Sequence, residues 1–111
     1  MSYLRPDQIG FGAWSASGVG TNAGVTVTHT ISSPAARSCV TGIEASGDAA
    51  ALVTIESPAS TVLYRKRFAA AFTLSEGFAT PIVGADSQNV LVKISASTSN
   101  CEANIQGYDA R

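Results

Sequence analysis

Residues 25–31, VTVTHTI, alternate between two kinds of side chain along their whole length. One set consists of two valines, His29 and an isoleucine, and the other consists of three threonines. Successive side chains of a β-strand point to opposite faces of a sheet, so this period of two predicts a strand that is buried on one face.

The same alternation returns in residues 51–57 (ALVTIES), 61–68 (TVLYRKRF) and 89–95 (NVLVKIS). The segments between these runs are rich in Gly, Pro, Asp and Ser, which favour turns. Residues 68–74 (FAAAFTL), where a helical turn would compete, are interpreted as strand because they continue a β-rich run. Short strands at intervals of about 10 to 12 residues predict an all-β chain, folded as an antiparallel β-sandwich or jelly roll.

Residues 1–24 have a different composition. The last sixteen of them, IGFGAWSASGVGTNAG, contain five glycines, and glycine disfavours a single ordered conformation. We therefore predict an extended, glycine-rich N-terminal arm over residues 1–24 and a β-sandwich domain over residues 25–111.

The predicted arm also carries large apolar side chains, which are unusual in a purely flexible segment. Such side chains indicate an arm that docks, either on its own domain or on a neighbouring subunit, where Trp and Tyr are favoured anchors. Both alternatives stay open from the sequence. The candidate interaction residues of the arm are Tyr3, Ile9, Phe11 and Trp14.

Length and charge exclude several classes of partner. The chain has 111 residues, which corresponds to one domain with a modest core. Charged residues make up only 14% of it and the net charge is −1, so the basic surface that binds a nucleic-acid backbone is missing. No apolar run approaches the roughly 20 residues that cross a bilayer, and the start lacks a signal-peptide pattern. We expect no nucleic-acid or membrane partner, synthesis in a cytoplasm, and reduced cysteines.

The single histidine and the two cysteines are candidates for chemistry. Counting alternate positions along their strands places His29, Cys39 and Cys101 on inward-facing sides, which predicts core thiols. A disulfide between the cysteines stays possible if their strands are neighbours. A nucleophilic pair would need a cysteine and His29 to converge in a cleft, and the spacing lacks the pattern of a metal site. We therefore predict no catalytic residue, no metal, no cofactor and no enzymatic activity.

The charged side chains suggest surfaces. Glu44, Asp48 and Glu56 are interpreted as a solvated rim and a turn residue rather than as paired catalytic carboxylates. In YRKRF, residues 64–68, strand alternation sends Arg65 and Arg67 to one face and the lysine between them to the other. These two arginines either pair with carboxylates across a subunit contact or keep an edge strand soluble. They complete the set of candidate interaction residues.

The order of segments supports a resemblance. A glycine-rich start is followed by SSPAARSCVTGIEASGD (residues 32–48), AALVTIES (50–57) and GFATPIVGADSQNVLVKISASTSNCEANIQGY (77–108). This order resembles small β-sandwich proteins of tailed-phage virions, and in particular it is similar to head decoration, or cement, proteins. The resemblance covers residues 25–108 and is most family-like in CVTGIEAS and ANIQGY. The two cysteines are not part of that pattern.

The resemblance implies a structural role. It implies a homotrimer that sits on the capsid surface of the virion after synthesis in the host cytoplasm, binds the major capsid protein and has no catalytic residues. The alternative is a small tail-fibre or receptor module that binds carbohydrate through exposed aromatic side chains. Against that alternative, Tyr64 and Phe68 fall on the apolar side of their strand, so few aromatics remain for a sugar platform.

Overall fold

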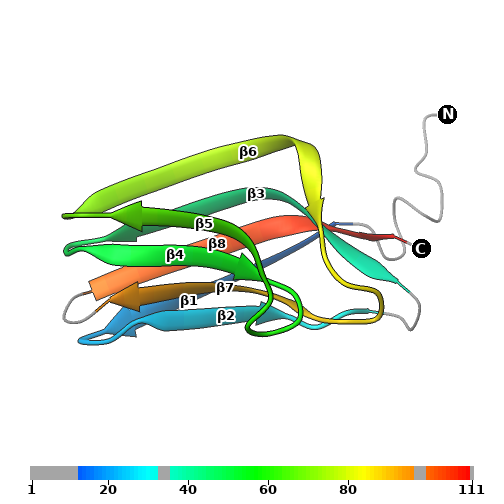
Figure 1. The fold of residues 1–111 in the computed structure, drawn as a ribbon, viewed down its shortest axis with the longest axis horizontal. Helices are drawn as coiled ribbons and strands as arrows, with labels where there is room; N and C mark the ends of the chain where they lie inside the picture. The colour runs from blue at the N-terminus through cyan, green and yellow to red at the C-terminus, as the bar shows by residue number, and fades with distance from the viewer. Residues whose placement is uncertain (1–12, 33–35, 97–99, 111) are drawn as a thin grey trace, which may run out of the picture.

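Alternating side chains produce an all-β chain in the computed structural model, which describes residues 13–32, 36–96 and 100–110. Its eight strands run along the long axis of the molecule (Figure 1). They are β1 (Ala13–Thr21), β2 (Val25–His29), β3 (Arg37–Gly47), β4 (Ala51–Glu56), β5 (Val62–Phe68), β6 (Phe72–Val83), β7 (Val90–Ala96) and β8 (Asn100–Ala110). The described residues form no helix that is long and apolar enough to cross a membrane.

The strands form two antiparallel sheets of four. Sheet A has the order β1-β8-β3-β6, and sheet B has the order β2-β7-β4-β5. Strand β1 pairs with β8, β2 with β7, β3 with β6 and β4 with β5, so the chain is one long hairpin rolled into two layers. This pairing is the jelly-roll arrangement and confirms the predicted fold class.

The core lies between the sheets and consists mainly of aliphatic side chains. Four isoleucines, each at most 1% exposed, form its centre. Two of them come from sheet A and two from sheet B, and each contributes roughly 1.5 to 3 kcal/mol through burial. The four are Ile43, Ile55, Ile94 and Ile105. The alternation of VTVTH, ALVTIE and VLVKIS therefore gives the inward faces that it predicts.

The first described strand corrects the predicted domain boundary. Residues 13–21 pair with β8 from Ala13 opposite Tyr108 to Thr21 opposite Asn100, which makes β1 an edge strand of sheet A. Glycine here allows close packing, because a Cβ on Gly18 would lie 2.8 Å from a methyl group of Val27. The prediction of an arm over residues 1–24 is therefore wrong for residues 13–21. Residues 1–12 lie outside the described part of the chain.

Aromatic pairs link β5 and β6 across the edge of the sandwich. The rings of Phe68 and Phe72 stack with centroids 4.3 Å apart, and those of Tyr64 and Phe78 meet edge to face at 5.5 Å. Between the two stacked rings the three alanines of FAAAFTL form a bend, so the interpretation of that stretch as continuous strand is wrong at residues 69–71.

Candidate functional site

Three connections meet at one end of the sandwich, on the right of Figure 1: those between β2 and β3, β4 and β5, and β6 and β7. Hydrogen bonds join them to one another and to the start of β3. The Gly84 amide donates to the Ser38 carbonyl at 2.7 Å. The Ser57 hydroxyl donates to the Asn89 carbonyl at 2.7 Å, and the Ile31 amide donates to the Asn89 side chain at 2.8 Å. This end, which we call the loop end, also contains the most connected polar cluster of the described residues.

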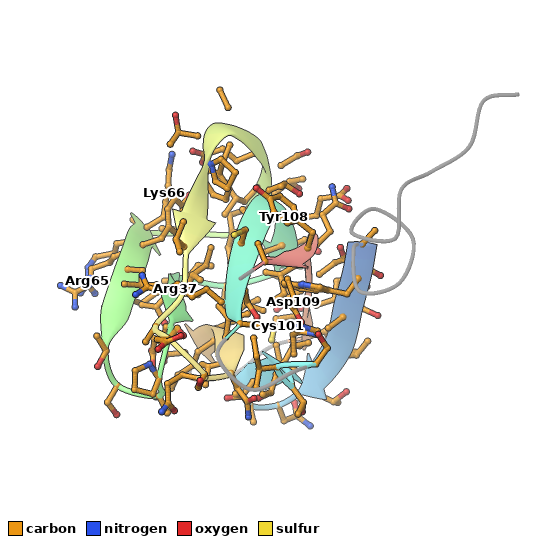
Figure 2. All side chains as sticks on the ribbon, turned by 90° about the vertical axis from the view of Figure 1, so that its right-hand side faces the viewer. Arg37, Arg65, Lys66, Cys101, Tyr108 and Asp109 are labelled. Atoms are coloured by element: carbon orange, nitrogen blue, oxygen red, sulfur yellow. The ribbon has the colours of Figure 1, made fainter. Side chains whose placement is uncertain are left out.

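The carboxylate of Asp109 is the centre of that cluster. It lies on the inward side of β8, labelled in Figure 2, and the residue is 3% exposed. His29 Nε2 lies 3.0 Å from both carboxylate oxygens, the Ser38 hydroxyl donates to Oδ1 at 2.9 Å, and the Ser32 amide donates to Oδ2 at 3.1 Å. We call His29, Ser32, Ser38 and Asp109 the Asp109 cluster.

Trp14 covers the imidazole of this cluster. Its ring lies parallel to that of His29, with centroids 3.8 Å apart and an interplanar angle of 7°. The indole Nε1 is buried, and no residue within the described ranges accepts a hydrogen bond from it. Of the two alternatives for Trp14, the structure therefore shows docking on its own domain.

Burial and hydrogen bonding act in opposite directions on Asp109. Burial alone would raise the pKa of this carboxyl group, but the donors from Ser32, His29 and Ser38 together hold the pKa below its usual value. The group is therefore a carboxylate at neutral pH. Its charge and the three donors make the Asp109 cluster a strong set of contacts.

The arrangement differs from a catalytic triad in its connectivity. In a triad the histidine lies between the serine and the aspartate and removes the serine proton. Here the aspartate lies between the histidine and the serine, and the hydroxyl of Ser38, which is fully buried, donates to Asp109. The Asp109 cluster ties β2 of sheet B to β3 and β8 of sheet A, so its chemistry serves the fold.

A β-bulge places Cys39 on the side opposite to the predicted one. The register of β3 shifts between Val40 and Gly42 against both of its neighbours. Val40 and Ile43 consequently both face the core although they are three residues apart. Cys39, on the other side of the strand from Val40, faces the outer side of sheet A, so the predicted inward orientation is wrong, although the thiol is buried as predicted.

Cys39 is nevertheless covered. Its cross-strand neighbours are Tyr108 and Val83, which are 39% and 46% exposed, whereas Cys39 is only 6% exposed. The adjacent Cys39 thiol is the main cause that raises the pKa of the Tyr108 hydroxyl. The three residues form an apolar row across the outer face of sheet A at the loop end (Figure 2 labels Tyr108).

Cys101 lies in the core, as predicted, but far from Cys39. It pairs with Gly47 on β3, whereas Cys39 pairs with Tyr108 on β8. The two pairs are seven positions apart along β8, which is about 23 Å at about 3.3 Å per residue. A disulfide spans at most about 7 Å between Cα atoms, so the two cysteines, both free thiols, do not bond within one chain. Burial raises the pKa of the Cys101 thiol.

The acidic candidates divide into two kinds. Glu44 and Asp48 are exposed, as expected for a solvated rim. Glu56 is 6% exposed and accepts hydrogen bonds from the Ser60 amide at 2.7 Å and the Thr54 hydroxyl at 2.8 Å. These two bonds, that of Ser60 first, hold the pKa of Glu56 below its usual value. The expectation of a solvated Glu56 is therefore wrong.

The basic candidates stay on the surface. Arg65 and Arg67 are exposed on β5, with their side chains on the outer side of sheet B (Figure 2 labels Arg65). Lys66, between them, is exposed on the opposite side of the strand (Figure 2). Tyr3, Ile9 and Phe11 lie outside the described residues, so of the predicted interaction residues only these two arginines lie exposed in the described part.

Sequence analysis did not identify Asp109 or Ser38. Continuing the alternation of Cys101, Ala103 and Ile105 along β8 places Asp109 on the inward side, and an inward carboxylate requires a donor. The inward position of Asp109 could therefore have been predicted from the sequence. Its contact with His29 could not, because alternation along β8 does not identify a partner on another strand. Within the described ranges, no three His, Cys, Asp or Glu side chains are grouped as metal ligands would be. Comparison with protein-family models, with curated proteins and with solved structures gives no match.

Proposed function

We propose that the protein is a structural subunit of a tailed-phage virion, a head decoration protein that binds the outer surface of the capsid shell. The observation that supports this proposal is that the most connected polar side chains bind one another inside the fold. His29, Ser38 and Asp109 are bound to one another inside the fold, while the outer faces of both sheets present broad surfaces with charged and apolar side chains. Extended surfaces of this kind suit contacts between proteins.

The proposed partner is the major capsid protein, and the proposed assembly is a homotrimer. A shell under pressure from packaged DNA is stabilised when many small proteins each bridge a subunit boundary. Attachment through several copies multiplies modest single contacts, because the second contact forms at a high effective concentration. A rigid jelly roll loses little conformational freedom when it binds, which preserves the affinity of each contact.

The proposed contact residues, toward the capsid or a sister subunit, are Arg65 and Arg67 together with Tyr3, Ile9 and Phe11, which stay predictions from the sequence. Trp14 is withdrawn from this set because it stacks on His29. Losing a large anchor costs about 2 kcal/mol or more, close to thirtyfold in affinity. Removal of residues 1–12 leaves β1 in place and therefore separates shell binding from folding.

The experiment measures binding of the full chain and of the chain lacking residues 1–12 to empty shells of the phage that encodes it, by co-sedimentation. We expect the full chain to bind and the shortened chain to bind at least about thirtyfold more weakly with an unchanged melting temperature. Full-length protein that does not bind such shells, or is missing from purified virions, would overturn the proposal. Equal binding by both chains would remove residues 1–12 from the interface.

The carbohydrate-binding alternative has less support. Tyr64 and Phe68 contact Phe78 and Phe72, so their rings do not form an exposed platform for a sugar. Trp14 likewise uses a ring face to contact His29. Among the described residues, Tyr108 is the one large exposed aromatic side chain. A glycan array gives the direct test, and a specific hit that Tyr108→Ala abolishes would favour this alternative.

A further inference from the structure

The outer face of sheet A has an acidic groove. A shallow depression of about 610 Å³ lies across β1, β8, β3 and β6, away from the loop end. Carboxylates, hydroxyls and an apolar side chain line it, and no lysine or arginine is among its lining residues. The side chains used in the argument are Val19, Glu44, Ser46 and Glu102. Val19 is 71% exposed, the highest value of any large apolar residue in the described part.

The two carboxylates of the groove are close neighbours. Glu44 pairs with Asn104 on β8, and Ser46, two residues further along β3, pairs with Glu102. The carboxylates are thus diagonal neighbours on one face, at a spacing of about 7 to 8 Å between backbone positions. The Ser46 hydroxyl donates to Glu102 at 3.3 Å, which leaves most of the negative charge facing solvent.

Strand β5 has the opposite character. It is an edge strand of sheet B, and its outer side carries Leu63, Arg65 and Arg67 at alternate positions. Leu63 is 39% exposed, and both arginines are exposed. Figure 2 shows Arg65 and Lys66 at the margin of the molecule. The outer side of β5 therefore complements the groove. Leu63 matches the exposed Val19, and the two guanidinium groups of β5 match the two carboxylates of the groove.

Within the described part of one chain, the charged groups of β5 and of the groove form no ion pairs. There, no carboxylate oxygen lies within 4.0 Å of a side-chain nitrogen of Arg65, Lys66 or Arg67, and no cation lies within that distance of Glu44 or Glu102. Guanidinium groups form strong paired hydrogen bonds with carboxylates when both partners are held on rigid elements. Both sets lie on β-strands, which hold their spacing fixed.

We propose that two copies of this chain associate head to tail, with β5 of one copy seated in the acidic groove of the next. Arg65 and Arg67 pair with Glu44 and Glu102 of the neighbouring copy, and Leu63 covers Val19. The two surfaces are different, so the contact is heterologous, and repeated contacts close into a ring or extend into a filament. This proposal concerns self-association and does not require that the chain bind a capsid.

The test is sedimentation velocity of the full chain at 20 mM and 500 mM salt. We expect concentration-dependent association at low salt that weakens at high salt, because salt screens exposed charges. The variants Glu44→Lys/Glu102→Lys and Arg65→Glu/Arg67→Glu should each raise the dissociation constant at least about tenfold. The variant with all four changes restores the charge pairing in reverse and should associate within about threefold of the original chain.

Two single variants control for charge reversal elsewhere on the surface. Asp86→Lys changes an exposed loop carboxylate, and Arg37→Glu changes an exposed cation outside the groove, and neither should alter association. All variants change exposed side chains, and circular dichroism checks that each folds. A chain that stays monomeric at 0.1 mM and low salt would overturn the proposal. Double variants that associate as the original chain does would also overturn it. So would a failure of the variant with all four changes to recover the association that the two double variants lose.

Discussion

His29 Nε2 lies 3.0 Å from each carboxylate oxygen of Asp109, although eighty positions separate the two residues in the chain. The contact crosses from β2 in sheet B to β8 in sheet A, so it joins the two layers at the loop end. Ser38 adds β3 to the same carboxylate. A single buried charge therefore connects three strands, and its removal leaves three donors without an acceptor.

Replacement of Asp109 by alanine should lower the free energy of unfolding by about 3 kcal/mol, because the buried Ser38 hydroxyl and the half-buried His29 imidazole both lose their acceptor. Urea denaturation measures the loss. The control is Asp86→Ala, an exposed carboxylate in the connection between β6 and β7, which should change stability by less than about 0.5 kcal/mol. Equal effects of the two substitutions would contradict the assigned role of the Asp109 cluster.

The pKa of Asp109 also predicts how stability depends on pH. Its value in the folded chain is below that of the unfolded chain, about 3.9, so the stabilisation is fully present above pH 4. It is lost as the pH falls from there through the lower folded value. The stability difference between the original chain and Asp109→Asn should therefore shrink as the pH falls below 4. A difference that does not change down to pH 2 would show that this carboxyl group does not titrate as assigned.

Tyr64 should ionise late. Burial first, and then its hydrogen bond to Glu76, in which the hydroxyl donates at 2.8 Å, raise the pKa of Tyr64 to about 12. Because the folded value exceeds the unfolded value of about 10, the associated stability is present below pH 10 and is lost as the pH rises toward 12. Absorbance at alkaline pH, compared with Tyr64→Phe, isolates this group. If the transition that Tyr64→Phe removes has its midpoint near pH 10, the assigned burial of Tyr64 and its hydrogen bond to Glu76 are contradicted.

Gly107 should tolerate no side chain. A Cβ there would collide with the Cys39 carbonyl oxygen at the β-bulge of β3, and the colliding atoms belong to the backbone. Gly107→Ala should therefore cost at least about 2 kcal/mol in thermal or urea unfolding. Gly77→Ala on β6 is the matched control, since nothing lies within 4 Å of its added Cβ, and it should be neutral or stabilising by up to about 1 kcal/mol. Similar costs at both positions would contradict this close approach.

Neither cysteine should react rapidly in the native protein. Cys101 is 3% exposed in the core, and Cys39 is 6% exposed between Tyr108 and Val83. Labelling with a thiol reagent should be slow in buffer and should reach two thiols per chain in urea. Ser15→Cys, which places a thiol at an exposed position of β1, is the positive control. Fast labelling of the unmodified native chain would instead indicate an accessible thiol and would revive a catalytic interpretation.

The sequence predicts the fold class well because the central strands have unbroken alternation. Residues 25–29, 51–56 and 90–95 form strands within the predicted runs, since one face of each packs into the core. Strand β1 escapes the same analysis because, after Trp14, its inward positions are occupied by small residues, including Gly18, which lies against Val27. Small residues are favourable in β1 because they pack closely against another strand. The local sequence pattern does not show which strand that will be.

The candidate site is less predictable for a geometric reason. The side of β3 that Cys39 occupies depends on one extra residue in the bulge, and a shift by one residue moves a side chain to the other face. The pairing of His29 with Asp109 depends on sheet order, which brings β2 and β8 together across the layers. Alternation along a strand assigns a side chain to a face, but it does not identify the partner on that face.

The place of β8 has a consequence for how the chain acquires its structure. This strand lies between β1 and β3 in sheet A, yet the ribosome makes it after the other seven described strands. Until residues 100–110 emerge, β1 and the β3–β6 pair have no strand to join them, and the carboxylate that His29 binds does not yet exist. Closing contacts between distant parts of a chain is slow, and unpaired strand edges are prone to aggregate meanwhile. Sheet A therefore cannot be completed until β8, the last of the described strands, has been made.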